Sequence, residues 1–146
     1  MALSFEFVSA FVCERALIDQ EGVLSAIRMV DIFQVPENIV QQTVITFYAV
    51  FSLRTMPVPD QDVKVAVYFA RASGDRDRLP NPPPDEPYKL RRFLADPSIP
   101  GGVLIVIQVN IQPRNAGVCF VELEVDDVVL ARIPVTILHI PVAPAS

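Results

Sequence analysis

The feature that most constrains the fold of this chain is an alternation of apolar and other side chains with a period of two. Side chains on a β-strand point alternately to opposite faces, so this alternation predicts strands with one buried face. Residues 63–69 repeat the pattern, and residues 103–111 show it in their most apolar form. The clearest example is residues 43–53, where the apolar odd positions are Ile45, Phe47, Ala49, Phe51 and Leu53.

Seven segments carry this pattern or a related apolar run, and most are separated by turn-forming residues. No segment shows a long amphipathic helical period. We therefore expect an all-β fold, an antiparallel β-sandwich of about seven strands, with a closed barrel as the alternative. The expected strands are Phe5–Ile18, Val23–Val35, Thr43–Leu53, Val63–Ala70, Val103–Gln112, Val118–Asp126 and Val128–Ile140.

Turn and proline chemistry refines these strands. Asp19–Gly22 predicts a hairpin turn after the first strand. Pro36 ends the second strand, and Pro134 indicates an edge or a bulge in the last one, because proline cannot donate to a ladder. Asp126-Asp127 predicts a tight turn, with a slightly wider turn as the alternative because a two-residue turn of this type requires positive φ twice. The apolar Val103–Gln112 run predicts a central strand.

Residues 73–102 differ from the rest of the chain and hold seven of its fourteen prolines. We expect a long proline-rich loop, inserted into a single domain that spans residues 1–146. Within it, Asp85–Leu94 predicts one or two helical turns, with acidic residues at the start and Arg91 and Arg92 near the end. Pro80–Pro83 could instead act as a polyproline ligand, although proline more often stiffens a connection.

Composition restricts the partners. A net charge of −5 gives no general attraction for nucleic acid or anionic membranes, so we expect neither as a partner. The start of the chain has no lysine or arginine before its apolar stretch and carries Glu6 and Glu14 within it, unlike a secretory signal. No apolar run approaches the length of a membrane span. A cytoplasmic location is the resulting expectation.

The residues that could bind metal are few. Cys13 and Cys119 each lie in an apolar run, and His139 is the only histidine. We expect two reduced core thiols, with a disulfide as the remaining possibility. A zinc site would lack ligands, and His139 lacks an evident nucleophile and acid, so no cofactor, metal or catalytic residue is predicted.

Both ends of the chain carry a family resemblance. It is carried by Phe11–Glu14, Asp19–Gly22 and Asp31–Phe33 at the beginning, and by Ala116–Phe120, Asp126-Asp127 and Ile133–Val135 at the end. About half of the chain resembles an uncharacterised bacterial family of short β-sandwich proteins, known as a domain of unknown function. The resemblance implies that fold and a bacterial origin, and no site residues.

Two surfaces could carry a function. Glu122 and Glu124 share one face of their strand, where a solvated acidic face, a small-ligand or hydrolytic site and a calcium site are the alternatives. Apolar side chains also occupy the nominally outer face of two successive strands, at Leu104 and Val106 and then at Val118 and Phe120.

If those two strands are neighbours, the four residues merge into one apolar patch that requires a cover. Either the turn with Tyr88 and Phe93 packs over it, or another subunit does. We therefore expect a non-enzymatic protein-binding or self-assembly module, with Leu104, Val106, Val118, Phe120, Tyr88 and Phe93 as its interface and a homo-oligomer or protein partner as the result.

Overall fold

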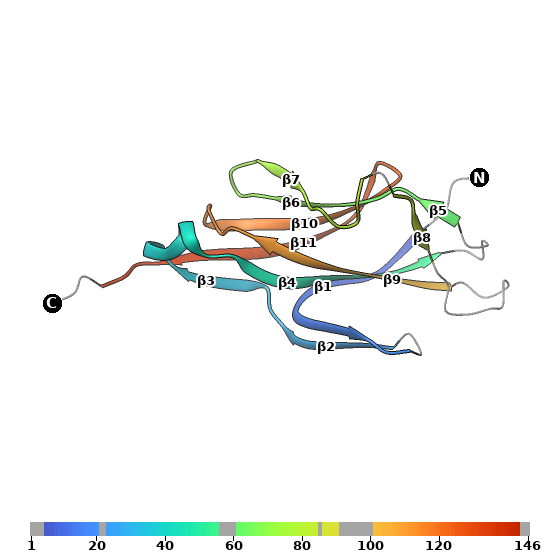
Figure 1. The fold of residues 1–146 in the computed structure, drawn as a ribbon, viewed down its shortest axis with the longest axis horizontal. Coiled ribbons are helices and arrows are strands. Elements are labelled where there is room, and N and C mark those ends of the chain that lie inside the picture. The colour runs from blue at the N-terminus through green and yellow to red at the C-terminus, as the bar shows by residue number, and fades with distance from the viewer. Residues whose placement is uncertain (1–4, 21–22, 56–60, 85, 91–100, 144–146) are drawn as a thin grey trace.

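The computed structural model describes residues 5–20, 23–55, 61–84, 86–90 and 101–143. This part of the chain is mostly β-structure arranged in three sheets, with one short 3₁₀ helix, η1 (Glu37–Gln42) (Figure 1). The all-β prediction is confirmed. Within the described residues, no helix has both the length and the apolar character that crossing a membrane requires.

The first sheet has four antiparallel strands in the order β2 (Leu24–Met29), β1 (Phe5–Ile18), β4 (Ile45–Thr55) and β9 (Gly101–Ile111). The prediction of a central strand at Val103–Gln112 is wrong, because β9 pairs only with β4 and lies at the edge of the sheet. Its apolar character reflects burial of one complete face and partial burial of the other.

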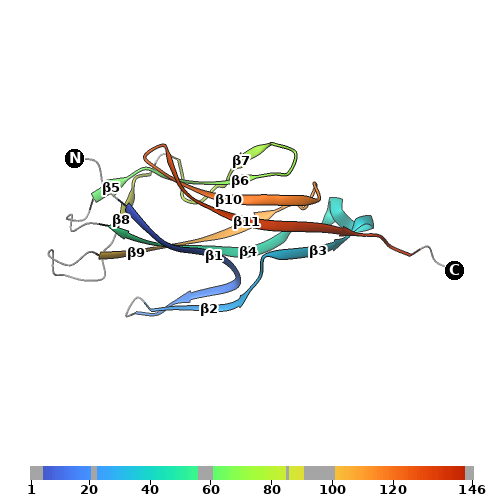
Figure 2. The same cartoon turned by 180° about the vertical axis from the view of Figure 1, so that it is seen from behind.

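The second sheet has five strands in the order β3 (Ile32–Pro36), β11 (Val128–Ile140), β10 (Gly117–Val125), β6 (Val65–Ala70) and β7 (Arg76–Arg78). Its ladders are antiparallel except for β3 and β11, which run parallel. A third sheet contains only β5 (Gln61–Val63) and β8 (Tyr88–Leu90). Of the five-stranded sheet, β6, β10 and β11 lie over β1 and β4 of the four-stranded one in both views of the ribbon (Figures 1 and 2).

One hydrophobic cluster joins the two larger sheets. From one sheet it contains odd-numbered residues of β4 and β9, and from the other it contains odd-numbered residues of β6, of β10 from Cys119 and of β11 between Ala131 and Ile137. The rings of Phe33 on β3 and Phe47 on β4 meet across this core, with their centroids 5.0 Å apart. The alternation in the sequence therefore identified the buried face of these five strands correctly.

Two predicted segments differ from the structure. The run Val23–Val35 is two strands and not one, because the chain leaves the four-stranded sheet after Met29 and enters the five-stranded sheet at Ile32. Arg28, just before this crossing, has a positive φ of 53°. Residues 73–102 are also less irregular than expected, since they contribute the short strands β7 and β8.

The predicted helical turn at Asp85–Leu94 is wrong where it can be checked. Tyr88–Leu90 is the strand β8, and it pairs with β5 through the register Gln61↔Leu90 and Val63↔Tyr88. Pairing with a distant strand overrode the local preference that the charged residues indicated. Asp85 and residues 91–94 lie outside the described part of the chain.

The structure tests the predictions at the prolines and at the last turn. Pro36 does end β3, an edge strand. Pro134 lies where β11 has β10 on one side and none of the described strands paired on the other, because β3 joins only from Thr136 onward. The tight turn at Asp126-Asp127 is confirmed, and the wider alternative is not formed: Val125 pairs with Val128, and both aspartates adopt positive φ, at 48° and 66°.

The far half of β1 forms a hairpin with β2 that extends from the body of the molecule. Pairing between β1 and β4 ends at Cys13, whereas pairing between β1 and β2 continues from Cys13 to Ile18. We call residues 14–20 and 23–29 the arm. In both ribbon views the arm lies away from the stacked strands (Figures 1 and 2).

Candidate functional site

The predicted apolar patch does not form as one surface. Leu104 and Val106 are on β9 in the four-stranded sheet, whereas Val118 and Phe120 are on β10 in the five-stranded sheet. The two strands follow each other in sequence but pair with different neighbours, β9 with β4 and β10 with β6 and β11. The assumption that they lie side by side is therefore wrong, and two separate surfaces take the place of the patch.

On the four-stranded sheet, Leu104 and Val106 lie on the face away from the core and are half-buried. The register places Val106 beside Val50, and Val50 beside Phe11, in one row across three strands. Val50 is fully buried in this row although it points away from the core. These side chains cover one another in part. As for the remaining predicted interface residues, Tyr88 is on β8, and Phe93 lies outside the described residues.

On the five-stranded sheet, Val118 is 50% exposed and Phe120 is half-buried. The register adds an exposed neighbour that the sequence did not indicate, because Val118 lies opposite Thr136, which in turn lies opposite Ile32. Ile32 is also 50% exposed. This end of the sheet keeps an apolar surface, and Phe120 marks where it meets a charged one.

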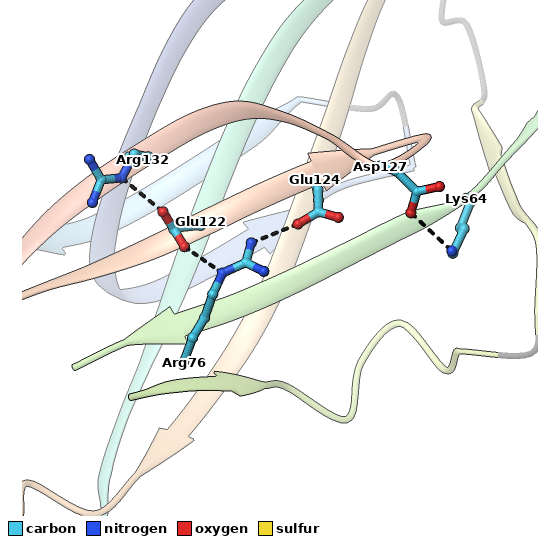
Figure 3. A network of polar contacts seen from close by, with 6 residues as sticks. All are labelled: Lys64, Arg76, Glu122, Glu124, Asp127 and Arg132. Atoms are coloured by element: carbon cyan, nitrogen blue, oxygen red, sulfur yellow. Dashed lines mark hydrogen bonds and ion pairs between the residues drawn. The ribbon is translucent and has the colours of Figure 1, made fainter. Parts of the chain in front are cut away.

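A network of ion pairs covers the middle of the same face (Figure 3). Glu122 accepts a hydrogen bond from Arg76 Nε at 2.9 Å on one carboxylate oxygen and from Arg132 Nε at 2.8 Å on the other. Arg76 Nη2 also donates to Glu124 at 2.6 Å. The prediction that Glu122 and Glu124 share a face is confirmed. The face is not a solvated acidic one, because Glu122 is only 8% exposed.

The two guanidinium groups are also stacked on aromatic rings. Arg76 lies 3.6 Å from the centroid of the Tyr68 ring, and Arg132 lies 4.0 Å from that of Phe120. The hydrogen bond to Glu124 and then the one to Glu122 raise the pKa of Arg76 above its ordinary value. Both carboxylates are therefore held by cations, a geometry that stabilises a sheet face and leaves little freedom for proton transfer.

The remaining predicted residues have structural surroundings. Cys13 and Cys119 are free and buried, and burial raises the pKa of the Cys13 thiol. His139 Nε2 donates a hydrogen bond to the carbonyl of Pro113 at 2.7 Å. Among the residues that the structure describes, no group of three His, Cys, Asp or Glu side chains is placed to hold a metal ion.

Five exposed apolar side chains gather on the arm, which the sequence did not single out. Met29 is 71% exposed, Leu17 57%, Val23 55%, Ile18 47% and Ile27 42%. The arm is a two-stranded ribbon beyond Cys13, and such a ribbon is marginally stable in water without a surface to pack against. The sequence did contain a signal for the arm. In residues 16–18 and 23–29, apolar residues occupy both odd and even positions, whereas a strand with one buried face has them at alternate positions only.

Comparison with known proteins gives distant structural likenesses only. No family model matches the chain, and no curated protein does. A CARDB domain from Pyrococcus furiosus, solved in complex with di-metal ions, is 15% identical over 94% of this chain and 95% of that one, with a TM-score of 0.41. An alkylpurine DNA glycosylase from Pseudomonas fluorescens, bound to DNA containing an abasic site analog, is 15% identical over 73% of this chain, with a TM-score of 0.39. This chain spans 27% of that glycosylase chain.

Proposed function

We propose that this protein is a non-enzymatic binding module that associates with a second copy of itself through the arm. The observation that supports the proposal is the exposure of Leu17, Ile27 and Met29 on a two-stranded ribbon. Among the described strands, the two strands of this ribbon pair only with each other beyond Cys13. Apolar side chains exposed together in this way mark a surface that a partner covers. The proposal keeps the predicted class of function and moves the interface from the patch to the arm.

The geometry of the arm favours a second copy. β2 is the outermost strand of its sheet, so its outer edge offers backbone hydrogen bonds in addition to apolar side chains. Two such edges placed antiparallel about a two-fold axis form one continuous sheet, and the same residues then contact their equivalents in the partner. We further propose that the two larger sheets form a β-sandwich around their shared core, which leaves the arm as the element that extends beyond it.

Self-association through the arm is tested by light scattering coupled to size-exclusion chromatography at ~10–100 µM protein, the range in which weak dimers form. The wild type is expected to be a dimer, and Met29→Asp and Leu17→Asp are expected to be monomers. Val118→Asp is the matched control, because it places the same charge at a comparably exposed position on the five-stranded sheet. It is expected to remain a dimer.

Other outcomes also decide the matter. A dimer that is lost in Val118→Asp and kept in both arm variants would return the interface to the Val118 and Phe120 surface. A wild type that is monomeric throughout this range would show that the arm does not mediate self-association. Circular dichroism of each variant establishes that it is folded before its mass is compared.

A further inference from the structure

A cleft of about 320 Å³ opens where β1 and β11 come close, at the side of the two larger sheets. Its walls are Ala10–Val12 of β1, Met29–Asp31 between β2 and β3, and Ile133 and Pro134 of β11. These lining residues are apolar except for Asp31. The cleft therefore has apolar walls and one carboxylate, that of Asp31, at its rim.

One wall of this cleft is a free sheet edge. β3 pairs with β11 only at Thr136–Ile140, so among the described strands none pairs with that side of β11 at Arg132–Pro134. The N–H of Thr136 donates to the carbonyl of Asp31 at 2.8 Å, on the side of β11 that faces β3. Backbone groups alternate along a strand, so the N–H and C=O of Arg132 and the C=O of Pro134 point to the same side.

The Asp31 carboxylate at the rim of the cleft is accessible to a ligand. Asp31 is exposed, and its carboxylate makes no hydrogen bond or ion pair with any residue in the described part of the chain. Its backbone carbonyl is held by Thr136, which fixes the position of the residue at the end of the cleft. The Asp31 carboxylate can therefore form an ion pair with a cation bound at this end of the cleft.

We propose that this cleft binds an extended peptide segment that carries a basic side chain, and that the segment pairs as a strand with the free edge of β11. An extended backbone is the ligand that can satisfy alternating N–H and C=O groups, and its inward side chains fill the apolar walls. Asp31 selects lysine or arginine at the end of the segment that lies near β3. Met29 belongs both to the arm and to a wall of the cleft, so the peptide is titrated against Leu17→Asp, a substitution outside the cleft that is expected to give a monomer.

The test uses a synthetic heptapeptide of alternating valine and threonine with one lysine, blocked at both ends. A second peptide carries glutamate in place of the lysine, and a third is N-methylated on the residues that would face β11. Amide NMR is the readout. The lysine peptide is expected to shift amides around the cleft and to slow exchange of the Arg132 N–H, which faces the free edge. The N–H of Ile133, which faces β10, is expected to be unaffected.

The variant Asp31→Asn removes the charge and keeps the backbone carbonyl. It is expected to weaken the lysine peptide about two- to fivefold, as for a partly exposed ion pair, and to abolish the preference over the glutamate peptide. Glu37→Gln, an exposed acidic residue on η1 that does not line the cleft, is the matched control and is expected to have no effect.

Three results would overturn the proposal. Equal binding of the N-methylated peptide would show that no strand pairing occurs. An Arg132 amide that exchanges at the same rate with and without peptide would place the ligand elsewhere. No shift at Ala10–Val12 or Val30–Asp31 at millimolar peptide would show that the cleft does not take an extended segment.

Discussion

Arg76 and Arg78 lie two residues apart on β7, on the same face of the sheet. The guanidinium of Arg76 has hydrogen-bond partners, whereas two buried nitrogens of Arg78 have none among the described residues. Arg76 bonds to Glu122 and Glu124 and stacks on Tyr68. Within the described part of the chain, Nε and Nη2 of Arg78 are the buried side-chain nitrogens that have no hydrogen-bond partner. Burying a charged donor without a partner opposes folding.

This contrast predicts opposite effects of the same substitution. Arg78→Met is expected to raise the free energy of unfolding by about 1 kcal/mol, because it replaces an unpaired cation with an apolar chain of similar length. Arg76→Met is expected to lower it by about 1–2 kcal/mol, because it breaks two charge-assisted hydrogen bonds. Urea titration at neutral pH measures both. A loss of stability in both variants would mean that Arg78 makes a stabilising contact of its own.

The residues that neutralise the acidic pair could not be identified from the sequence. Alternation placed Glu122 and Glu124 on one face correctly, but Arg76 and Arg132 reach them across strand pairings. The sequence separation between Arg76 and Glu122 is 46 residues. Periodicity determines the face of a strand on which a side chain lies and contains no information about which strand is its neighbour.

In the β10–β11 hairpin, the positions of the inward residues conflict with the register that the turn imposes. The inward residues are odd-numbered on both strands. Two inward residues can therefore pair across the ladder only if the sum of their residue numbers is even. The two-residue turn pairs Val125 with Val128, which is an odd total. A register shift between Glu124 and Leu123 removes the conflict. Beyond it, Leu123 pairs with Ala131 and Glu122 pairs with Arg132. A turn one residue wider, the alternative that the sequence left open, would have resolved the same conflict.

The aspartates of this turn predict a second pair of effects. Asp127→Gly is expected to stabilise the protein by up to about 1 kcal/mol, because glycine adopts a φ of 66° without the cost to an L-residue. It loses only the exposed ion pair with Lys64. Asp126→Gly is expected to give no gain, because Asp126 Oδ1 accepts the N–H of Lys64 at 3.0 Å. Thermal unfolding monitored by circular dichroism compares the two, and an equal gain in both would show that this bond is unimportant.

Other elements were beyond sequence reasoning for identifiable reasons. No glycine or proline separates β2 from β3, so Val23–Val35 looked continuous although the chain changes sheets within it. The charges around Tyr88–Leu90 favoured a helical turn, and pairing with β5 outweighed them. The strands of the core hairpins, in contrast, were predicted closely because burial of one face imposes the period directly.

For the molecule as a whole, the single-domain prediction is open to a direct test. Ile105 on β9 and Ile133 on β11 are both buried in the shared core but belong to different sheets. Ile105→Val and Ile133→Val are each expected to lower the free energy of unfolding by about 0.5–1.5 kcal/mol. If the chain is one cooperative unit, each substitution shifts the urea midpoint of amides in both sheets equally. A shift confined to the substituted sheet would divide the molecule into two units.

The parallel pairing of β3 with β11 has a consequence for how the protein is made. Ile32 and its partner Thr136 are 104 residues apart. A ribosome that adds about 5–20 residues per second needs roughly 5–20 seconds to pass from one to the other. Throughout that interval β3 has been synthesised but the strand it pairs with has not, so its backbone edge remains without its partner. The nascent chain therefore carries β3 as an unpaired strand during this period, and the five-stranded sheet closes only after β11 has left the ribosome.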